Sequence, residues 1–186
     1  MLVGNLVYLR SMEMEDMDQV RKWNFDPQIR PSLNTSLPVS RIQQKLWFER
    51  LQTDRTKHKL VIVDRTTGRD IGIMSAMKID HEHKNCEVGW TIGEKEFWGK
   101  GHAIDAAFTF LSFLFDQFGL HMVYAYVLSS NARALSFFVN KIGFAETGRY
   151  KEARFKDGVY IDNVLLCLRK EDMVKTMNQR GYTLRP

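Results

Sequence analysis

The chain has 186 residues, of which 44% are hydrophobic and 26% charged, and its formal net charge is +5. This length is enough for one well-buried core and short for two. We therefore expect a single domain over residues 1–186, with its core at about residues 5–170 and a C-terminal tail at 171–186. The Lys and Arg residues are scattered rather than clustered, which argues against a nucleic-acid partner. A coenzyme phosphate or an anionic substrate would account for the positive charge equally well.

Neither a membrane segment nor an export signal is expected. The most apolar run, around Ala106 to Leu114, is interrupted by Thr109 and Ser112 and is far shorter than a bilayer requires. The N-terminal stretch lacks a basic region followed by a long apolar run and a cleavage site. We therefore expect a cytoplasmic protein.

The sequence contains little that suggests a disulfide or a metal site. Cys86 and Cys167 lie in alternating apolar segments, where we expect both to be core thiols. His81 and His83 would share one face of a strand without an evident third ligand, so a solvated turn is the simpler interpretation. No metal is expected.

Hydrophobic periodicity predicts alternating strands and helices. Period-two patterns predict strands at residues 5–10, 60–63, 71–79, 85–92, 122–128, 144–150 and 159–168. Helices are predicted from Met17 to before Pro27, from Ser40 to near Thr53, and at about 102–118, 131–141 and 170–179. Residues 28–39 read as an irregular loop, and loops of this length often carry binding function. A helix joins the strands at 85–92 and 122–128, so this pair should run parallel in an otherwise antiparallel sheet of an α+β fold.

The stretch from Trp90 to Ala107 reads W-T-I-G-E-K-E-F-W-G-K-G-H-A-I-D-A-A. It combines a strand end, two glycines one residue apart and a helix start. Free N–H groups of a first helical turn, reached through a glycine turn, form an anion site. A third glycine and a Lys-Ser/Thr ending are both missing, which argues against a dinucleotide fingerprint and an NTPase loop. We therefore predict that this turn holds the pyrophosphate of a coenzyme.

The run E-V-G-W-T-I-G-E-K-E-F-W-G-K-G-H-A from Glu87 and the later S-S-N-A-R-A-L-S-F-F-V-N-K-I-G-F ending at Phe144 resemble the GNAT family of acyl-CoA N-acyltransferases. The resemblance extends over about residues 5–170. It is greatest to the branch with ribosomal-protein alanine, polyamine and amino-sugar acetyltransferases. It implies a mixed, mostly antiparallel sheet of six to seven strands with helices on both faces and one parallel strand pair splayed at the acyl-CoA site. Members of this branch are often homodimers.

The resemblance also implies the coenzyme contacts. Acetyl-CoA would bind through the backbone of the glycine turn and of the preceding strand, with Asn131 and Phe138 on the following helix. The implied residues are Trp90, Thr91, Ile92, Trp98, Gly99, Lys100, Gly101, His102, Ala103, Asn131 and Phe138. Asn131 could equally be a simple helix N-cap. The expected reaction is acetyl transfer to a primary amine by direct attack in a ternary complex.

Two catalytic roles are needed, since the ammonium must lose a proton and the CoA thiolate leaves. Glu87 matches the position of a family glutamate thought to act as base, although an ion pair with a nearby Lys or Arg explains it equally well. Phe138 occupies the position where many members have a proton-donating tyrosine. Tyr160, Tyr126 or Ser136 could replace it, or the thiolate could leave unassisted because its pKa is only modestly above neutrality. The helix also has one extra residue before Gly143, which predicts a local register shift.

The acceptor is the least determined part of the prediction. Trp23, Arg30 and Trp47 are the expected substrate contacts, because they border or lie in the irregular loop. A polyamine site should gather carboxylates, whereas residues 24–40 contain one acid, Asp26, against Arg30. An amino sugar or its nucleotide conjugate, a protein N-terminus and a polyamine all stay open. A second hypothesis, motivated by Phe138, is an acyl-CoA-binding module without turnover.

Overall fold

The structure is a computed structural model that describes residues 1–33 and 39–184. Of the loop expected at residues 28–39, the first part forms a short 3₁₀ helix, η2 (Arg30–Ser32), and residues 34–38 lie outside the described residues. The end of the expected C-terminal tail, residues 185–186, also lies outside them.

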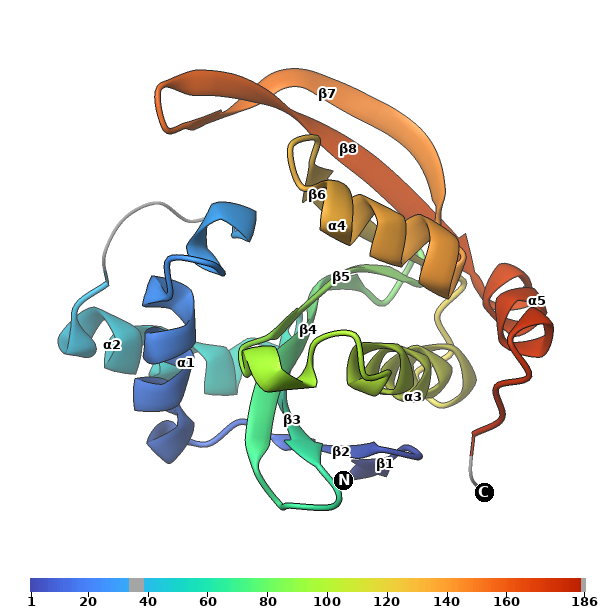
Figure 1. Cartoon of the computed structure of the whole chain (residues 1–186), viewed down its shortest axis with the longest axis horizontal. Helices are drawn as coiled ribbons and strands as arrows, with labels where there is room; N and C mark the ends of the chain where they lie inside the picture. The colour runs from blue at the N-terminus through green and yellow to red at the C-terminus, as the bar shows by residue number, and fades with distance from the viewer. Residues whose placement is uncertain (34–38, 185–186) are drawn as a thin grey trace.

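A single mixed sheet organises the molecule (Figure 1). Its strands are β1 (Leu2–Val3), β2 (Val7–Ser11), β3 (His58–Asp64), β4 (Asp70–Asp80), β5 (Asn85–Ile92), β6 (Met122–Leu128), β7 (Ala145–Lys156) and β8 (Val159–Arg169). Their order is β1-β2-β3-β4-β5-β6-β8-β7, and β5 and β6 form the parallel pair that the sequence predicts. The sheet has eight strands rather than six to seven. The additional strand, β1, has two residues and is too short to show an alternating pattern.

Helices cover both faces of the sheet, as expected. They are α1 (Met17–Phe25), α2 (Arg41–Thr53), α3 (His102–Asp116), α4 (Ala132–Ser136) and α5 (Lys170–Gln179), with short 3₁₀ turns η1 (Met14–Asp16) and η3 (Lys95–Phe97). Strand alternation divides the core between the two faces. Val61 and Val63 of β3 pack with α1 and α2, whereas Ile62 between them packs with α3. Figure 1 shows α1 and α2 on one side of the sheet and α3 and α4 on the other.

Local signals explain where α2 begins. The Ser40 hydroxyl accepts a hydrogen bond from the backbone N–H of Gln43 at 3.2 Å, and the Gln43 side chain accepts one from the Ser40 N–H at 2.9 Å. This reciprocal capping box satisfies two N–H groups that the helix itself cannot bond. The predicted start and end of this helix are confirmed.

The predicted helix at residues 131–141 consists of an α-helical part and a π-helical part. After α4, residues Phe137–Ile142 form a π-helical turn, η4, in which the N–H of Gly143 donates to the carbonyl of Phe138 at 3.0 Å. A π turn accommodates one residue more than an α-turn. The extra residue noted in the sequence is absorbed here, so the predicted register shift is confirmed.

Two smaller expectations have different outcomes. Cys86 is fully buried, as predicted, but Cys167 is half-buried. It alternates on β8 with Leu166 and Leu168, whose side chains fill the core, so Cys167 faces the opposite side. His81 and His83 lie in the turn between β4 and β5, and the described part of the chain holds no metal-binding cluster. No helix within that part is both long and apolar enough to span a bilayer.

Candidate active site

A cavity of about 1420 Å³ opens where β5 and β6 separate. The two strands pair from Asn85 and Met122 to Glu87 and Tyr124, after which β5 continues to Ile92 and β6 to Leu128 without further pairing. Within the described residues, the backbone of β5 beyond Glu87 therefore has no strand paired on its β6 side. The cavity wall includes residues from both faces of the sheet, so the opening connects the two sides.

The glycine turn forms one end of the cavity. Gly99 and Gly101 have φ of 75° and 89°, in the left-handed region that favours glycine. Gly101 is the N-cap of α3, and none of the backbone N–H groups from Gly99 to Ala103 has a hydrogen-bond partner within the described residues. The helix dipole adds positive potential at the same place. The turn therefore has the unpaired donors and the positive potential that the predicted anion site requires, and these suit a pyrophosphate.

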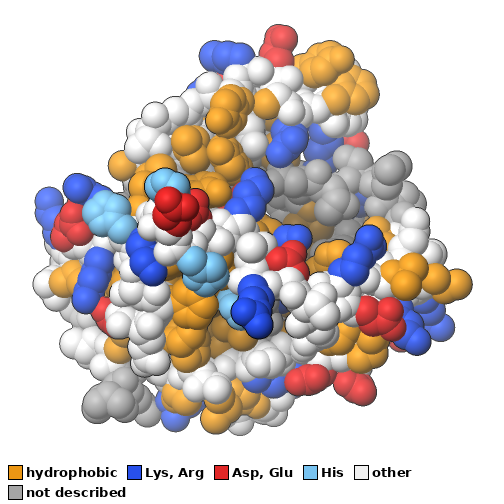
Figure 2. Space-filling model, turned by 180° about the vertical axis from the view of Figure 1, so that it is seen from behind, with side chains coloured by type: hydrophobic (Ala, Val, Ile, Leu, Met, Phe, Trp, Pro, Cys, Tyr) orange, Lys and Arg blue, Asp and Glu red, His pale blue; other side chains and the backbone are white. Residues whose placement is uncertain are grey.

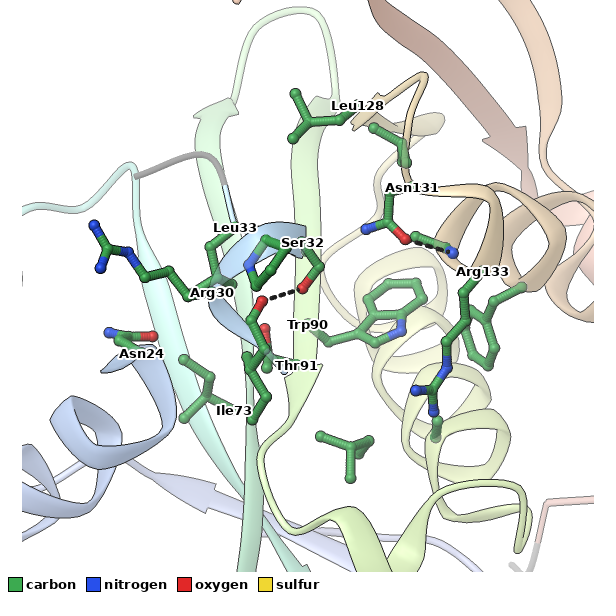
Figure 3. A pocket seen from close by; sticks show the side chains of 18 of the residues that line it. Asn24, Arg30, Ser32, Leu33, Ile73, Trp90, Thr91, Leu128, Asn131 and Arg133 are labelled. Carbon is green, nitrogen blue, oxygen red and sulfur yellow. Dashed lines mark hydrogen bonds between the residues drawn. The ribbon is translucent and has the colours of Figure 1, made fainter. Parts of the chain in front are cut away.

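Most of the predicted coenzyme contacts meet on this wall. Figure 3 shows Trp90 and Thr91 between two groups, with Asn24 and Arg30 on one side and Leu128, Asn131 and Arg133 on the other. The predicted residues that line the cavity are Trp90, Thr91, Ile92, Trp98, Gly99, Gly101, Ala103, Asn131, Phe138, Arg30 and Trp47. The predicted residues outside the wall are Trp23, Glu87, Lys100, His102 and Tyr160.

Asn131 caps a helix and also borders the cavity. Its Oδ1 accepts a hydrogen bond from the N–H of Ala134 at 3.0 Å, which makes it the N-cap of α4. Its side chain also borders the cavity, as Figure 3 shows. Capping the helix thus holds this amide at the position where the coenzyme arm is expected.

Aromatic stacking forms the wall beyond Asn131. The Phe138 ring stacks on Trp90 with 4.6 Å between ring centroids and 26° between planes. Phe138 is buried and also contacts Phe144 edge to face, with centroids 5.0 Å apart. A phenylalanine has no hydroxyl, so this position supplies packing and no proton.

The side chains of His102 and Trp23 pack within the fold and lie outside the cavity wall. The His102 side chain is buried, and its Nε2 lies 3.0 Å from the Asp64 carboxylate. Trp23 packs under Gly93 and donates from its indole N–H to Glu94 at 2.9 Å. An aromatic residue near a binding loop can either pack in the core or contact a ligand, and the sequence pattern does not distinguish the two roles.

Glu87 lies at the point where the strands part. It faces the same side of the sheet as Thr91, and its carboxylate pairs with the Lys78 ammonium at 2.8 Å. The same ammonium lies 5.7 Å from the centre of the Tyr126 ring. The Glu87 hydrogen bond raises the pKa of Lys78, although burial opposes the shift. Glu87 therefore forms an ion pair with a nearby basic residue, which was one of the two interpretations that the sequence left open.

The three candidate proton donors lie in different environments. Tyr160 is 67% exposed and packs on Phe155 near the tip of the β7–β8 hairpin, where Figure 2 shows hydrophobic side chains gathered. Tyr126 and Ser136 line the cavity. Burial and a hydrogen bond to Tyr150 raise the pKa of Tyr126 to about 12. A tyrosine with such a pKa stays protonated at neutral pH and can act as a donor.

Sequence reasoning missed five basic residues of the wall, which are Arg21, Lys59, Arg133, Lys141 and Lys156. The Arg133 guanidinium lies 3.8 Å from the centre of the Trp98 ring, although Arg133 and Trp98 are far apart in the sequence. Lys59 lies 5.2 Å from the centre of the Trp47 ring. Lys156 donates to three carbonyl oxygens of the η2 segment, at 2.7 to 3.0 Å. Each is one of many scattered basic residues, and only tertiary contacts select it.

Residues 7–145 match the sequence profile of the acetyltransferase (GNAT) domain. The chain belongs to this family. The "Uncharacterized N-acetyltransferase p20" of Bacillus licheniformis is 25% identical over 167 residues, which cover 88% of this chain and 93% of that protein. The spermidine N(1)-acetyltransferase of Escherichia coli is 22% identical over 178 residues, covering 96% and 94%.

Solved structures agree on the fold. A spermidine N-acetyltransferase from Vibrio cholerae, in complex with CoA and spermine, superposes with a TM-score of 0.83 at 22% identity, covering 91% of this chain and 98% of that one. The GNAT family assignment makes acetyl-CoA the donor, and the unpaired N–H groups of the glycine turn fit its pyrophosphate. The expected fold and acetyltransferase class are confirmed.

Proposed function

We propose that this GNAT protein transfers the acetyl group of acetyl-CoA to a primary amine by direct attack in a ternary complex. The observation that carries the proposal is the continuity of one cavity through the gap between β5 and β6. The coenzyme would enter from the glycine turn, and the amine from the face covered by α1 and α2. The two substrates would then meet beside β5.

The proposal uses the unpaired edge of β5 to activate the thioester. Beyond Glu87, the N–H groups of this edge face the cavity rather than a strand. An N–H directed at the thioester carbonyl stabilises the negative charge that develops on its oxygen. Trp90, Thr91 and Ile92 would supply this backbone. The role requires no particular side chain.

Glu87 is the proposed base. An alkylammonium with a lysine-like pKa is almost entirely protonated at neutral pH and must lose a proton before it attacks. Glu87 lies on the acceptor face where β5 and β6 part, but its carboxylate is outside the cavity wall and holds Lys78. It would therefore receive the proton through an intervening water molecule.

Tyr126 is the proposed donor to the leaving thiolate, in place of Tyr160. Tyr126 lines the cavity and stays protonated, whereas Tyr160 is exposed and outside the wall. Ser136 also lines the cavity, and its hydroxyl accepts a hydrogen bond from Asn140 at 3.2 Å. A thiolate is a good leaving group, so the donor contributes only part of the rate.

The test is a screen of amines with detection of released CoA thiol. Its members are spermidine, amino sugars, nucleotide-linked amino sugars and peptides with a free N-terminus. We expect saturable CoA release with at least one class. Tight acetyl-CoA binding without thiol release from any amine would contradict the proposal. That result would favour the alternative, motivated by Phe138, of an acyl-CoA-binding module without turnover.

We also propose that the 186 residues form one domain, that the protein is cytoplasmic and that it assembles as a homodimer. A related spermidine N-acetyltransferase from Vibrio cholerae is described as dodecameric, with a TM-score of 0.75. Light scattering after size-exclusion chromatography measures the assembly, limited proteolysis tests the single domain, and cell fractionation tests the location. A monomer at micromolar concentration would contradict the dimer.

A further inference from the structure

The cavity wall is strongly cationic. Within the described residues, one acidic side chain, Asp157, lines it, against the basic side chains of Arg21, Arg30, Lys59, Arg133, Lys141 and Lys156. Residues 34–38, which the structure does not describe, are Asn-Thr-Ser-Leu-Pro and contain no acid. A cavity intended for a polycation would be expected to show the opposite balance.

These cations divide between the two ends of the cavity. Arg133 and Lys141 belong to α4 and η4, on the coenzyme side, where Arg133 covers Trp98. The other four lie away from the glycine turn, on α1, η2, β3 and the β7–β8 hairpin, and are Arg21, Arg30, Lys59 and Lys156. Phosphates of the coenzyme account for the first group but not for the second.

Lys59 is the central cation of the acceptor end. It alternates on β3 with Val61 and Val63, so its side chain faces α1 and α2. The register places it beside Ser75, which pairs with Gly89 of β5, in one row across the sheet. Lys59 therefore lies on the face from which the amine approaches β5.

The charge of Lys59 is not neutralised by the residues that the structure describes. The described residues supply neither an ion-pair partner nor a hydrogen-bond acceptor to its ammonium, and its nearest recorded contact is the Trp47 ring at 5.2 Å. Burial lowers the pKa of Lys59, with a smaller contribution from Lys57. An anionic ligand placed here would compensate a cation that the fold leaves unpaired.

Arg21 and Lys156 differ in how many of their hydrogen-bond donors have a partner. The Nε of Arg21 is buried and has no hydrogen-bond partner among the residues described, and its ion pair with Asp18 is long, at 3.7 Å. Lys156 is bound by three backbone carbonyls of the η2 segment. Arg21 thus retains donor capacity toward a ligand, whereas Lys156 holds the wall together.

We propose that the acceptor is a primary amine that also carries a carboxylate or phosphate group, bound by Lys59 and Arg21. The inference rests on the proposed acetyl transfer and specifies its substrate class. A polyamine such as spermidine would add charge to a wall that already repels it. An anionic group would at the same time fix the orientation of the amine toward β5.

The test compares amines that differ only in an anionic group. The pairs are glucosamine 6-phosphate with glucosamine, phosphoethanolamine with ethanolamine, and glycine with glycinamide, and spermidine is measured beside them. We expect kcat/KM to be at least about tenfold higher for the anionic member of a pair, as for one charge-assisted hydrogen bond. The first two pairs report on phosphate and the third on carboxylate.

Two variants locate the effect. Lys59→Met should reduce the preference for the anionic member about tenfold, because kcat/KM should fall more for the anionic member than for the neutral one. Lys57→Met is the matched control, because Lys57 is close in sequence but pairs with Asp54 at 2.7 Å and does not line the cavity. It should leave both members unchanged. Equal loss with the two variants would overturn the role of Lys59.

The outcomes separate this inference from the proposed function. Higher kcat/KM for spermidine or for the neutral members would overturn the inference and leave acetyl transfer established. If no amine released CoA, the proposed function would fail. Calorimetry with CoA-loaded protein would then compare glucosamine 6-phosphate with glucosamine, and equal affinities would overturn the inference as well.

Discussion

The two ends of the cavity are constructed in opposite ways. The proposed coenzyme end depends mainly on backbone groups, since the N–H groups of residues 99–103 and the free edge of β5 come from one stretch of chain. The acceptor end consists of side chains from α1, η2, α2, β3 and the β7–β8 hairpin. A site made of backbone groups depends on where glycine allows a left-handed conformation. A site made of side chains depends on which distant segments the fold brings together.

This difference predicts separable effects. Changes at the glycine turn should alter the affinity for acetyl-CoA and leave the amine unaffected. Changes at the acceptor end should alter the KM for the amine and leave coenzyme affinity unaffected. Residues near the point where β5 and β6 part should alter kcat, because both substrates meet there.

The largest effect is expected for Glu87→Gln. Removing a general base should lower kcat about 100-fold while acetyl-CoA affinity stays within twofold, because the amide cannot accept the proton. Steady-state kinetics and calorimetry measure these quantities. The matched control is Lys78→Met, which removes the ion pair but keeps the carboxylate. It should retain kcat within about threefold, because the Lys78 side chain is exposed and water can take its place beside Glu87. Equal loss of kcat in both variants would mean that Glu87 acts only through the pair.

Gly99→Ala tests the backbone end. A side chain at φ of 75° costs about 1–2 kcal/mol and displaces the N–H groups, so the Kd for acetyl-CoA should rise about tenfold. Gly68→Ala is the matched control, because Gly68 has φ of 69°, also has open space around it and lies in the turn between β3 and β4. Chemical denaturation should show similar losses of stability for both. Unchanged coenzyme affinity in Gly99→Ala would contradict the predicted pyrophosphate site.

Tyr126→Phe tests the choice of proton donor. Loss of the hydroxyl should lower kcat about tenfold, less than a general acid usually contributes, because the thiolate can leave unassisted. Tyr160→Phe should leave kcat within twofold, since Tyr160 is exposed and outside the wall. Single-turnover measurements of thiol release report this step. A larger loss with Tyr160→Phe than with Tyr126→Phe would restore the expectation made from the sequence.

The smallest effect is expected for Lys156→Met. Its three hydrogen bonds to carbonyls of Arg30, Pro31 and Leu33 hold the η2 wall against the hairpin. Their loss should raise the KM for the amine about threefold with kcat nearly unchanged. The control is Lys151→Met on the same strand, because the Lys151 side chain is 77% exposed and pairs with Asp162 instead. If Lys156→Met weakened acetyl-CoA binding as much as it raised the KM for the amine, the two ends of the cavity would not be separable.

Much of the fold follows from local patterns. The strands of the central sheet, the capped start of α2 and the extra residue in η4 were predictable, because each depends on alternation, capping or helix register within a few residues. β1 was not predictable because it has two residues and depends on pairing with β2. Cys167 was expected in the core, but alternation with Leu166 turns it to the other face.

The sequence alone predicted the glycine turn that we propose as the coenzyme end of the site. Gly99 and Gly101 permit left-handed backbone, and a helix start after them leaves N–H groups free, whatever surrounds them. Only the tertiary structure decided the acceptor end. Lys59 and Arg21 line one cavity because α1 and β3 pack on the same face, and among the described residues that packing gives the Lys59 ammonium no ion-pair partner. Side-chain chemistry assembled over long sequence separations has no local signature, whereas backbone chemistry does.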